Sequence, residues 1–289
     1  MLLVLPLAYF FIFKYKPMAG LLIAFKEYKF KLGYFKSPWA SAYGFKHFLR
    51  FFQNAYFREI MWNTVSVSIL QLALSFPVPI ILALIMNELK SVIVKKIMQL
   101  VTYAPHFIST VILVAIMQSM LNPSTGVINK IIEFAGGKPV YFFGRPEWFK
   151  PLYVLSGIWQ NSGYNSIIYL AALTNVDPQL IEAAKIDGAN RLRILQHITL
   201  PAIVPTAVVL LIMNFGKVMN VGFEKAYLMQ NSMNERTSEV ISTYVYKCGI
   251  ENMQYSYSTA VGLFNAVINI ILLLSVNKIA KKLTETSLW

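Results

Sequence analysis

Long apolar runs separated by shorter polar segments dominate the sequence and predict a helical membrane protein. A helix needs roughly 20 mostly apolar residues to cross a bilayer. Five stretches meet this requirement, at about 62–86, 100–120, 152–173, 202–219 and 259–279. Because the bilayer core offers no water to backbone groups, each stretch is expected to form one membrane-spanning α-helix.

The first residues are apolar but fall short of a full span. Residues 1–13 are followed at once by Lys14 and Lys16. A cleaved signal peptide would normally have a basic start and a small-residue cleavage site, and neither is visible. We therefore expect an abbreviated first span, or one that begins upstream, which brings the number of spans to six.

Six spans place both termini on one side of the membrane, together with the loop 174–201. The positive-inside rule gives the opposite orientation for this loop, because only a minority of the 26 Lys and Arg residues fall on its side. Many of the others lie in the aromatic segment 14–61. This segment is expected either to lie at the membrane surface on the outer side or to pack as an ordinary loop on the helices.

The composition supports a membrane protein and argues against other classes. The chain is 56% hydrophobic and 13% charged, and its mean hydropathy is +0.54. The net charge of +13 does not form one basic face, so nucleic-acid binding is not expected. The single Cys248 cannot form an internal disulfide. We expect residues 1–61 to form the first span and an outer segment, and residues 62–289 to form one membrane domain.

Residues 174–201 contain a short helix with clear signals at both ends. Asp177 can cap the free amides, Pro178 suits the first helical position, and Gly188 can adopt the left-handed conformation that ends a helix. The pattern predicts a helix over about 178–187, which is either a docking surface for another protein or a connector that packs on its own chain.

The sequence from Glu182 to Pro201, E-A-A-K-I-D-G-A-N-R-L-R-I-L-Q-H-I-T-L-P, resembles the coupling-loop signature of binding-protein-dependent ABC importer permeases. Further segments resemble the sugar and oligosaccharide permeases of the maltose-permease type. These segments are Tyr15-Lys16-Pro17-Met18, Ile23-Ala24-Phe25-Lys26, Asn63-Thr64, Val221-Gly222-Phe223-Glu224, Ser238-Glu239-Val240-Ile241-Ser242-Thr243-Tyr244 and Ala260-Val261-Gly262-Leu263-Phe264-Asn265. The chain departs from the family at its short start and at Arg193-Ile194-Leu195, where an aromatic residue is more usual.

The resemblance implies an all-α type I ABC importer permease with six spans and a cytoplasmic coupling helix between the fourth and fifth. It implies that Glu182 contacts an ATPase subunit, that Ala183 and Ala184 allow close packing, and that Gly188 makes the turn. Asp187, Leu200 and Pro201 complete the implied coupling residues. The loop 174–201 and both termini would then be cytoplasmic at the plasma membrane, against the count of basic residues.

The implied assembly contains a second homologous permease, two ATPase subunits with ATP and Mg, and an extracellular substrate-binding protein. This chain is not expected to be an enzyme or to hold a cofactor, since it has no G-x-x-x-x-G-K-[ST] phosphate loop. His47, His106 and His197 are isolated from one another and from any cluster with metal-ligand spacing, so no metal site is expected. No nucleophile has a matched base.

Polar side chains within the spans are candidates for a transport pathway, because polar groups facing lipid are costly. Amides both donate and accept, which suits sugar hydroxyls, and two aromatic residues could stack on a sugar ring. The alternative is hydrogen bonding between helices. The candidates are Gln118, Trp159, Gln160, Asn161, Tyr164, Asn165, Asn214, Lys217, Asn265 and Asn269.

Two other transporter classes fit the sequence less well. A secondary transporter of a polar solute remains the alternative, but it would need internal inverted repeats and buried carboxylates, and the five long spans contain neither Asp nor Glu. An ion channel would need a filter or a charged ring. The resemblance favours an oligosaccharide or a modified sugar as substrate, without indicating which one.

Overall fold

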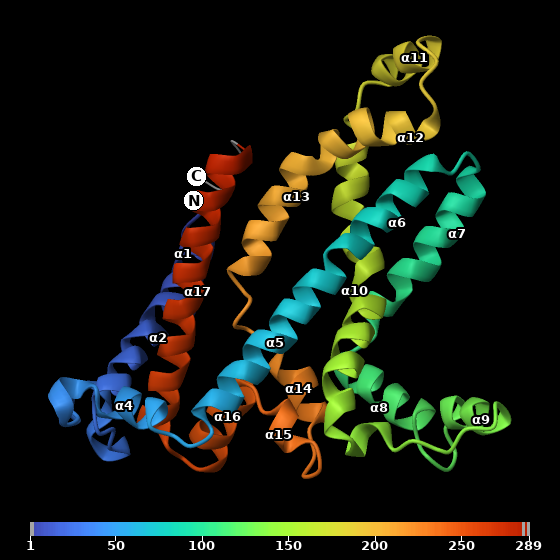
Figure 1. The fold of residues 1–289 in the computed structure, drawn as a ribbon. Coiled ribbons are helices and arrows are strands. Elements are labelled where there is room, and N and C mark those ends of the chain that lie inside the picture. Colours follow the sequence, from blue (N-terminus) through green and yellow to red (C-terminus); the bar gives the residue numbers. More distant parts are fainter. Residues whose placement is uncertain (1–2, 285–286, 288–289) are drawn as a thin grey trace.

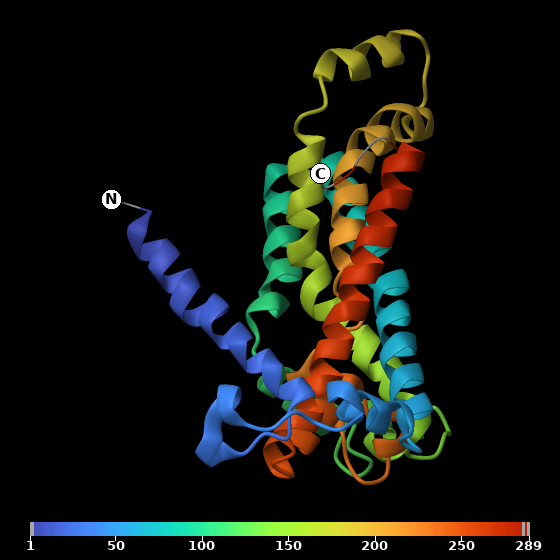
Figure 2. The same ribbon diagram turned by 90° about the vertical axis from the view of Figure 1, so that its left-hand side faces the viewer.

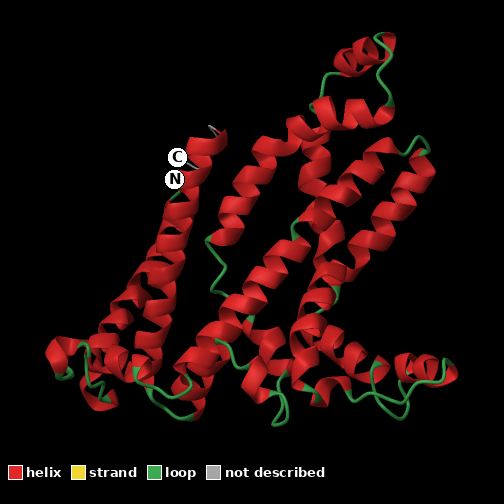
Figure 3. Cartoon of the chain, viewed as in Figure 1, coloured by secondary structure: helices red, strands yellow, loops and turns green. Residues whose placement is uncertain are grey.

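The structure is a computed structural model that describes residues 3–284 and 287. Within these residues the chain is a layer of long helices with short helices at both ends (Figures 1 and 3). The β-type pairing among the described residues consists of one isolated antiparallel bridge between Lys26 and Trp39. The expected all-α class is therefore confirmed for the described residues.

The long helices and the short ones alternate along the chain. The α-helices are α1 (Val4–Phe10), α2 (Lys16–Met18), α3 (Gly33–Lys36), α4 (Lys46–Phe52), α5 (Phe57–Ser75), α6 (Pro77–Glu88), α7 (Val92–Tyr103), α8 (Thr110–Met120), α9 (Val127–Phe134), α10 (Phe149–Leu173), α11 (Pro178–Ile186), α12 (Arg191–Ile194), α13 (Leu200–Phe215), α14 (Phe223–Met229), α15 (Glu235–Ser238), α16 (Ile241–Tyr246) and α17 (Tyr255–Thr284). Short 3-10 or π turns are η1 (Phe11–Tyr15), η2 (Ala19–Phe25), η3 (Phe30–Leu32), η4 (Ala42–Gly44), η5 (Ala104–Phe107), η6 (Phe142–Gly144), η7 (Pro146–Trp148), η8 (Leu195–Thr199) and η9 (Lys247–Glu251).

Several helices are long and apolar enough to cross a membrane, so this is a multi-pass membrane protein. Among the described residues they are Val4–Phe25, Phe57–Glu88, Arg191–Phe215 and Tyr255–Lys282, and a bent pair of helices supplies a fifth candidate. α10 is 25 residues long and lies along the same layer, but its sequence is more polar (Figure 1). Every apolar stretch read from the sequence therefore contributes helix to the layer.

The span predicted at 100–120 is wrong in its extent. The first arm of the bent pair runs from Val92 to Phe107, and the chain then turns by 99° into α8, Thr110–Met120. In Figure 1 the second arm lies across the end of the layer. The apolar run continues through the bend, so hydropathy alone could not reveal it.

Local hydrogen bonds hold this bend in place. The Ser109 hydroxyl caps α8 by accepting from the Ile112 N–H at 3.3 Å. The Gln160 side chain of α10 donates to the Ile108 carbonyl at 2.9 Å, which satisfies a carbonyl that the break in the helix leaves free. Gln160 is therefore a structural amide that supports the turn.

The first span is longer than predicted. It was expected to end near Phe13, but the helical segment continues through Lys14 and Lys16 to Phe25. Long lysine side chains can extend to a polar region while their backbone remains in the helix, so the two charges do not end it. Figure 2 shows that this segment diverges from the other helices and that its start lies apart from them.

The two ends of the layer carry different structures. α11 and α12 project at one end, where the start of α1 and the end of α17 also lie (Figure 1). We call this the α11 end. The opposite end, here the α9 end, carries the short helices α4, α8, α9 and α14–α16. The expectation that the termini share a side with residues 174–201 agrees with this arrangement.

α10 lies at the centre of the packing. It contacts α5, α6, α7 and α13, and small residues allow its neighbours to approach. A Cβ on Gly163 would lie 2.0 Å from the Thr102 carbonyl oxygen of α7. Glycine therefore permits a backbone-to-backbone contact that any larger residue would prevent.

Candidate functional site

A cavity of about 350 Å³ lies between α5, α6, α10, α13 and the turn that follows α13. Its volume is within the range typical of small-molecule sites. The lining residues are Val67, Ser68, Gln71, Leu72, Ser75, Phe76, Pro79, Tyr153, Gly157, Asn161, Ser162, Asn165, Ile168, Tyr169, Leu210, Asn214, Lys217, Val218, Asn220, Val221 and Gly222. Amides and hydroxyls from three helices thus meet apolar side chains around one space.

Some polar atoms of the cavity wall have unused hydrogen-bonding capacity. Gln71 Oε1 and Ser162 Oγ are buried and have no hydrogen-bond partner among the described residues. Buried polar atoms are normally paired, since an unpaired group costs about 1–3 kcal/mol. The described chain therefore leaves an acceptor and a hydroxyl unpaired beside this cavity.

The structure brings together four of the pathway candidates. Asn161 and Asn165 line the cavity from α10, where four-residue spacing places them on one face. Asn214 and Lys217 line it from the end of α13 and the following turn. Candidates from two separate predicted spans thus meet at one site.

The other candidates do not line the cavity. They are Gln118, Trp159, Gln160, Tyr164, Asn265 and Asn269. Tyr164 stacks on His106 with ring centroids 4.0 Å apart and an interplanar angle of 7°. Its ring face is therefore already in contact with another ring, and Trp159 is half exposed outside the cavity.

Asn265 and Asn269 act on the cavity indirectly. Their Nδ2 groups donate to the Asn220 Oδ1 at 2.9 and 3.1 Å. Asn269 Oδ1 also accepts from the Met219 backbone N–H at 3.0 Å. These amides of α17 hold the turn after α13 in place. Their role is the hydrogen bonding between helices that the sequence left open as the alternative to lining a transport pathway.

Sequence reasoning missed the contribution of the second predicted span. Ser68, Gln71 and Ser75 all line the cavity from α5. Gln71 and Ser75 are four residues apart and are joined by a hydrogen bond from the Gln71 amide to the Ser75 hydroxyl. The signal was present as polar side chains at helical spacing within an apolar stretch. Tyr153 and Asn220 were also missed because only the fold brings them to this space.

α11 forms as the sequence predicts and ends one residue earlier. Asp177 Oδ1 accepts from the Gln179 N–H at 2.9 Å, and Pro178 occupies the first turn. Gly188 has φ +78°, in the left-handed region, and terminates the helix. The predicted cap, start and stop are confirmed.

None of the residues of α11 is buried. Leu180 is 57% exposed and Ile186 is 86% exposed. Glu182, Ala183, Asp187 and Gly188 are exposed as well, and Ala184 is half-buried. Most of the expected coupling residues therefore form one accessible projection. Leu200 instead packs on the cluster of Ala83 and Leu173, with Pro201 exposed beside it.

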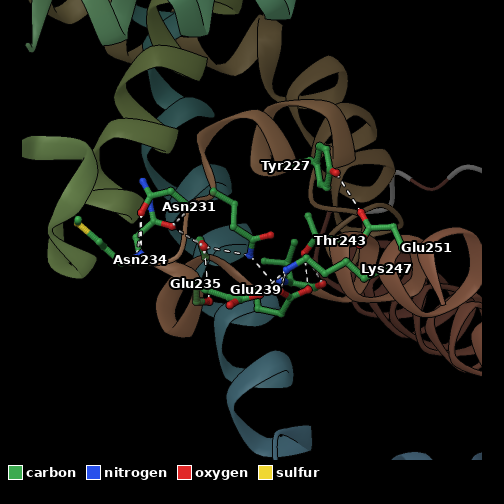
Figure 4. Close-up of polar contacts among 12 residues, drawn as sticks. Tyr227, Asn231, Asn234, Glu235, Glu239, Thr243, Lys247 and Glu251 are labelled. Atoms are coloured by element: carbon green, nitrogen blue, oxygen red, sulfur yellow. Dashed lines mark hydrogen bonds and ion pairs between the residues drawn. The ribbon is translucent and has the colours of Figure 1, made fainter.

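The α9 end is held together by charged and polar contacts (Figure 4). Lys247 Nζ lies 2.6 Å from Glu235 Oε1 and 2.5 Å from Glu239 Oε2. Burial opposes the charge on Lys247, but these hydrogen bonds outweigh it and raise the pKa of the ammonium. Glu239 also accepts from Thr243, and Tyr227 donates to Glu251. These contacts join α14–α16 and η9 into one structured surface.

The long helices with a polar cavity between them are the features of a membrane permease. The chain matches the family model "Binding-protein-dependent transport system inner membrane component" over residues 75–285. The chain belongs to this family.

Individual relatives support the same assignment over the whole chain. The polygalacturonan/rhamnogalacturonan transport system permease protein YteP of Bacillus subtilis (strain 168) is 47% identical over 289 residues, which are 100% of this chain and 89% of that protein. Protein LplB of the same organism is 46% identical, with coverage of 100% and 90%.

A solved structure shows the same fold. A bacterial ABC transporter involved in the import of the acidic polysaccharide alginate has a chain that matches with a TM-score of 0.91 and 42% identity, covering 98% of this chain and 94% of that one. The sequence-based assignment to the permeases of binding-protein-dependent ABC importers, of the kind that transports sugars and oligosaccharides, is therefore confirmed.

Proposed function

We propose that this chain forms one half of the membrane pathway of an ATP-driven oligosaccharide importer. The observation that carries the proposal is the cavity, where amides and hydroxyls from α5, α10 and α13 converge beside apolar side chains. Sugars present hydroxyls that donate and accept, together with apolar ring faces, so this wall matches their chemistry. Named transport relatives act on polygalacturonan, rhamnogalacturonan and alginate.

The proposal includes six membrane spans. The helical segments at 4–25, 57–88, 191–215 and 255–282, the arm 92–107 and α10 would each cross once. α10 can be more polar than the others because neighbouring helices cover much of its surface. The α11 end would then be cytoplasmic and the α9 end extracytoplasmic, with 1–61 forming the first span and an outer segment.

α11 is the proposed coupling helix. Its exposed apolar and charged side chains would dock in a groove of an ATPase subunit, with Glu182 making the charged contact and Ala183 and Ala184 allowing close approach. ATP and Mg would bind to that partner, and this chain would carry no catalysis. Asp187 and Gly188 would shape the turn toward α12, and Leu200 and Pro201 would join it to the pathway.

The remaining proposed partners are a second homologous permease, a second ATPase subunit and an extracellular binding protein. The solved alginate transporter is known in complex with a pentasaccharide-bound periplasmic protein. In this chain the structured α9 end offers the corresponding surface. Proposed pathway residues are those that line the cavity, Asn161, Asn165, Asn214 and Lys217, and those that support it, Asn265 and Asn269.

Affinity purification from detergent-solubilised native membranes tests this assembly. The tagged chain should recover an ATPase and a second permease, and the purified complex in proteoliposomes should accumulate an oligosaccharide only with ATP and a binding protein. Recovery of the chain alone, under conditions that preserve other importer complexes, would contradict the proposal. Accumulation driven by an ion gradient without ATP would instead indicate a secondary transporter.

A further inference from the structure

Residues 29–36, here called the aromatic loop, lie between the first span and α4 and consist mainly of η3 and α3. Their sequence, K-F-K-L-G-Y-F-K, mixes lysines with large apolar side chains. Phe30 is 85% exposed and Phe35 is 71% exposed. The exposed lysines of the loop are Lys29, Lys31 and Lys36. The aromatic loop therefore exposes aromatic and cationic side chains together.

The chain on both sides of the aromatic loop is held close to the point where the first span ends. The Ala40 N–H donates to the carbonyl of Phe25, the last residue of that span, at 3.0 Å. The Tyr28 N–H donates to the Ser256 hydroxyl, near the start of α17, at 3.0 Å. In Figure 2 the segment that contains the loop lies at the foot of the first span. Since a residue adds at most about 3.6 Å of reach, the loop stays near the boundary of the membrane.

Buried side chains fix the shape of the aromatic loop. Ser37 is buried, and its hydroxyl accepts from the Lys29 N–H at 3.0 Å and donates to the Gly33 carbonyl at 2.7 Å. Lys26 is also buried, and its Nζ donates to the Phe35 carbonyl at 2.6 Å. Gly33 has φ +66°, a conformation that glycine adopts without strain between η3 and α3. The exposed aromatic side chains are therefore carried by a defined backbone.

The three lysines of the aromatic loop form none of the ion pairs found among the described residues, which join other side chains. Glu27 is the one acidic residue in the sequence from 1 to 58. Its carboxylate pairs with Lys46 at 2.5 Å. The aromatic loop therefore carries a positive charge that is not neutralised within the described chain, beside the end of an apolar helix.

This combination of side chains matches the surface of a bilayer that contains anionic lipids. Aromatic residues favour the headgroup region, where an apolar ring leaves water without entering the middle of the bilayer. A lysine has an apolar stem and a terminal ammonium that can donate to a phosphate oxygen. A partner protein could also cover aromatic side chains, but the aromatic loop follows directly on a span, so the bilayer surface is already beside it.

We propose that the aromatic loop lies on the bilayer surface, with its two phenylalanines in the headgroup region and its three lysines bound to phosphates of anionic lipids. The inference rests on the topology proposed above, in which the first span crosses the membrane and the α9 end is extracytoplasmic. The positive-inside rule disfavours so many basic residues on that side, and lipid phosphates supply the negative charge that the chain lacks there. The loop then anchors a span that diverges from the other helices (Figure 2).

The test measures how closely two lipids approach the aromatic loop. The full chain is purified with the subunits that it retains and is placed in lipid nanodiscs. A bimane fluorophore is attached through Phe35→Cys in a Cys248→Ser background, because Cys248 is the one native cysteine. Quenching by brominated phosphatidylglycerol, which is anionic, is compared with quenching by brominated phosphatidylcholine, which has no net charge. Phe30→Cys provides a second position for the label.

We expect phosphatidylglycerol to quench at a concentration at least about fivefold lower than phosphatidylcholine, which is the factor for one lysine near an anionic surface. Raised salt should reduce this preference. The triple variant Lys29→Gln, Lys31→Gln, Lys36→Gln should bring the ratio of the two lipids close to one. The triple variant Lys29→Arg, Lys31→Arg, Lys36→Arg keeps the charge and should keep the preference. Lys130→Gln, on exposed α9 away from the loop, is a further control and should not change the ratio.

Each contrary outcome overturns the inference in its own way. Quenching by neither lipid would place the aromatic loop in water or, if the emission is shifted to the blue, under a partner protein. Equal quenching by both lipids would show contact with the membrane without binding of anionic lipid. An unchanged ratio after the three Lys-to-Gln substitutions would assign the preference to other residues. All of these results are independent of ATP-dependent oligosaccharide uptake, so a failure here is distinguishable from a failure of the proposed function.

Discussion

α10 and α11 follow one another in the sequence and behave in opposite ways. α10 buries residues along its whole length, from Phe149 to Leu173, and packs against α5, α6, α7 and α13. α11 buries none, although it is well capped and contains Leu180 and Ile186. The connection between the two helices is four residues long, so the change is abrupt.

This difference shows which interactions stabilise each helix. α10 is held by neighbours within its own chain, since packing between helices drives association in a membrane. A helix as short as α11 is marginal by itself, and its caps stabilise it only in part. Its exposed apolar side chains are therefore suited to a partner protein, whereas α10 is suited to forming a rigid wall of the cavity.

The largest expected effect concerns the function of α11. Glu182→Arg should reduce ATP-dependent uptake to background, because it reverses the charge at the proposed ATPase contact. The variant should insert in the membrane normally, since the side chain is exposed. Uptake in vesicles and the amount of co-purified ATPase provide the measurements.

Glu133→Arg is the matched control for this change. Glu133 is exposed on α9, at the opposite end of the layer. The same reversal of charge there should leave ATPase co-purification at the wild-type level. If Glu182→Arg retained normal uptake, α11 would have to be regarded as a connector.

The next prediction compares the stability of the chain after a Leu-to-Ala substitution at two sites, one buried in α10 and one exposed on α11. Leu173→Ala removes a side chain that is 4% exposed and packed with Tyr169 and Ile203. We expect a loss of about 2 kcal/mol or more from the cavity that remains. Leu180→Ala, at a position 57% exposed, should change stability by less than about 0.5 kcal/mol. The unfolding midpoint of the purified chain measures both, and equal losses would contradict the contrast between the helices.

A smaller effect tests the close packing of α10. Gly163→Ala would place a Cβ 2.0 Å from the Thr102 carbonyl oxygen, so α7 must move away at a cost of about 1–3 kcal/mol. Gly262→Ala is the control, because a Cβ there would meet no atom within 4 Å. That change should be neutral or stabilising by about 0.5–1 kcal/mol, as for Gly to Ala within a helix. Thermal unfolding compares the two, and a stable Gly163→Ala variant would show that the two backbones do not need this approach.

The same contrast explains how much could be read from the sequence. Hydropathy located the helical layer, and capping residues located α11 to within one residue. The bend after Phe107 was missed because apolar residues continue through it, and its hydrogen bonds come from Ser109 and the distant Gln160. Periodicity describes one helix and carries no information on a bond between two helices.

The candidate site was predicted in part for a similar reason. An amide within a span is visible in the sequence, but its partner is not. Asn161 and Asn165 face the cavity, whereas Asn265 and Asn269 bind Asn220. Gln71 was overlooked on the second predicted span although it lines the same space. Which amide meets the cavity depends on how the helices are rotated, and that is set by packing.

The last prediction concerns the pH dependence of the support that α10 receives from the buried Lys225 amine. Lys225 Nζ in α14 donates to the Tyr153 carbonyl at 2.6 Å. Burial lowers the pKa of Lys225 from 10.5 to about 7. Between these pH values the unfolded chain binds a proton that the folded chain does not, so stability should rise with pH from about 7 to about 10.5. Lys225→Met removes this titration. The difference in unfolding midpoint between wild type and variant should therefore shift in favour of the wild type as the pH is raised from 7 to 9. A difference that stays constant over this interval would show that Lys225 remains protonated, and that the contact with α10 stabilises its charge as well as its position.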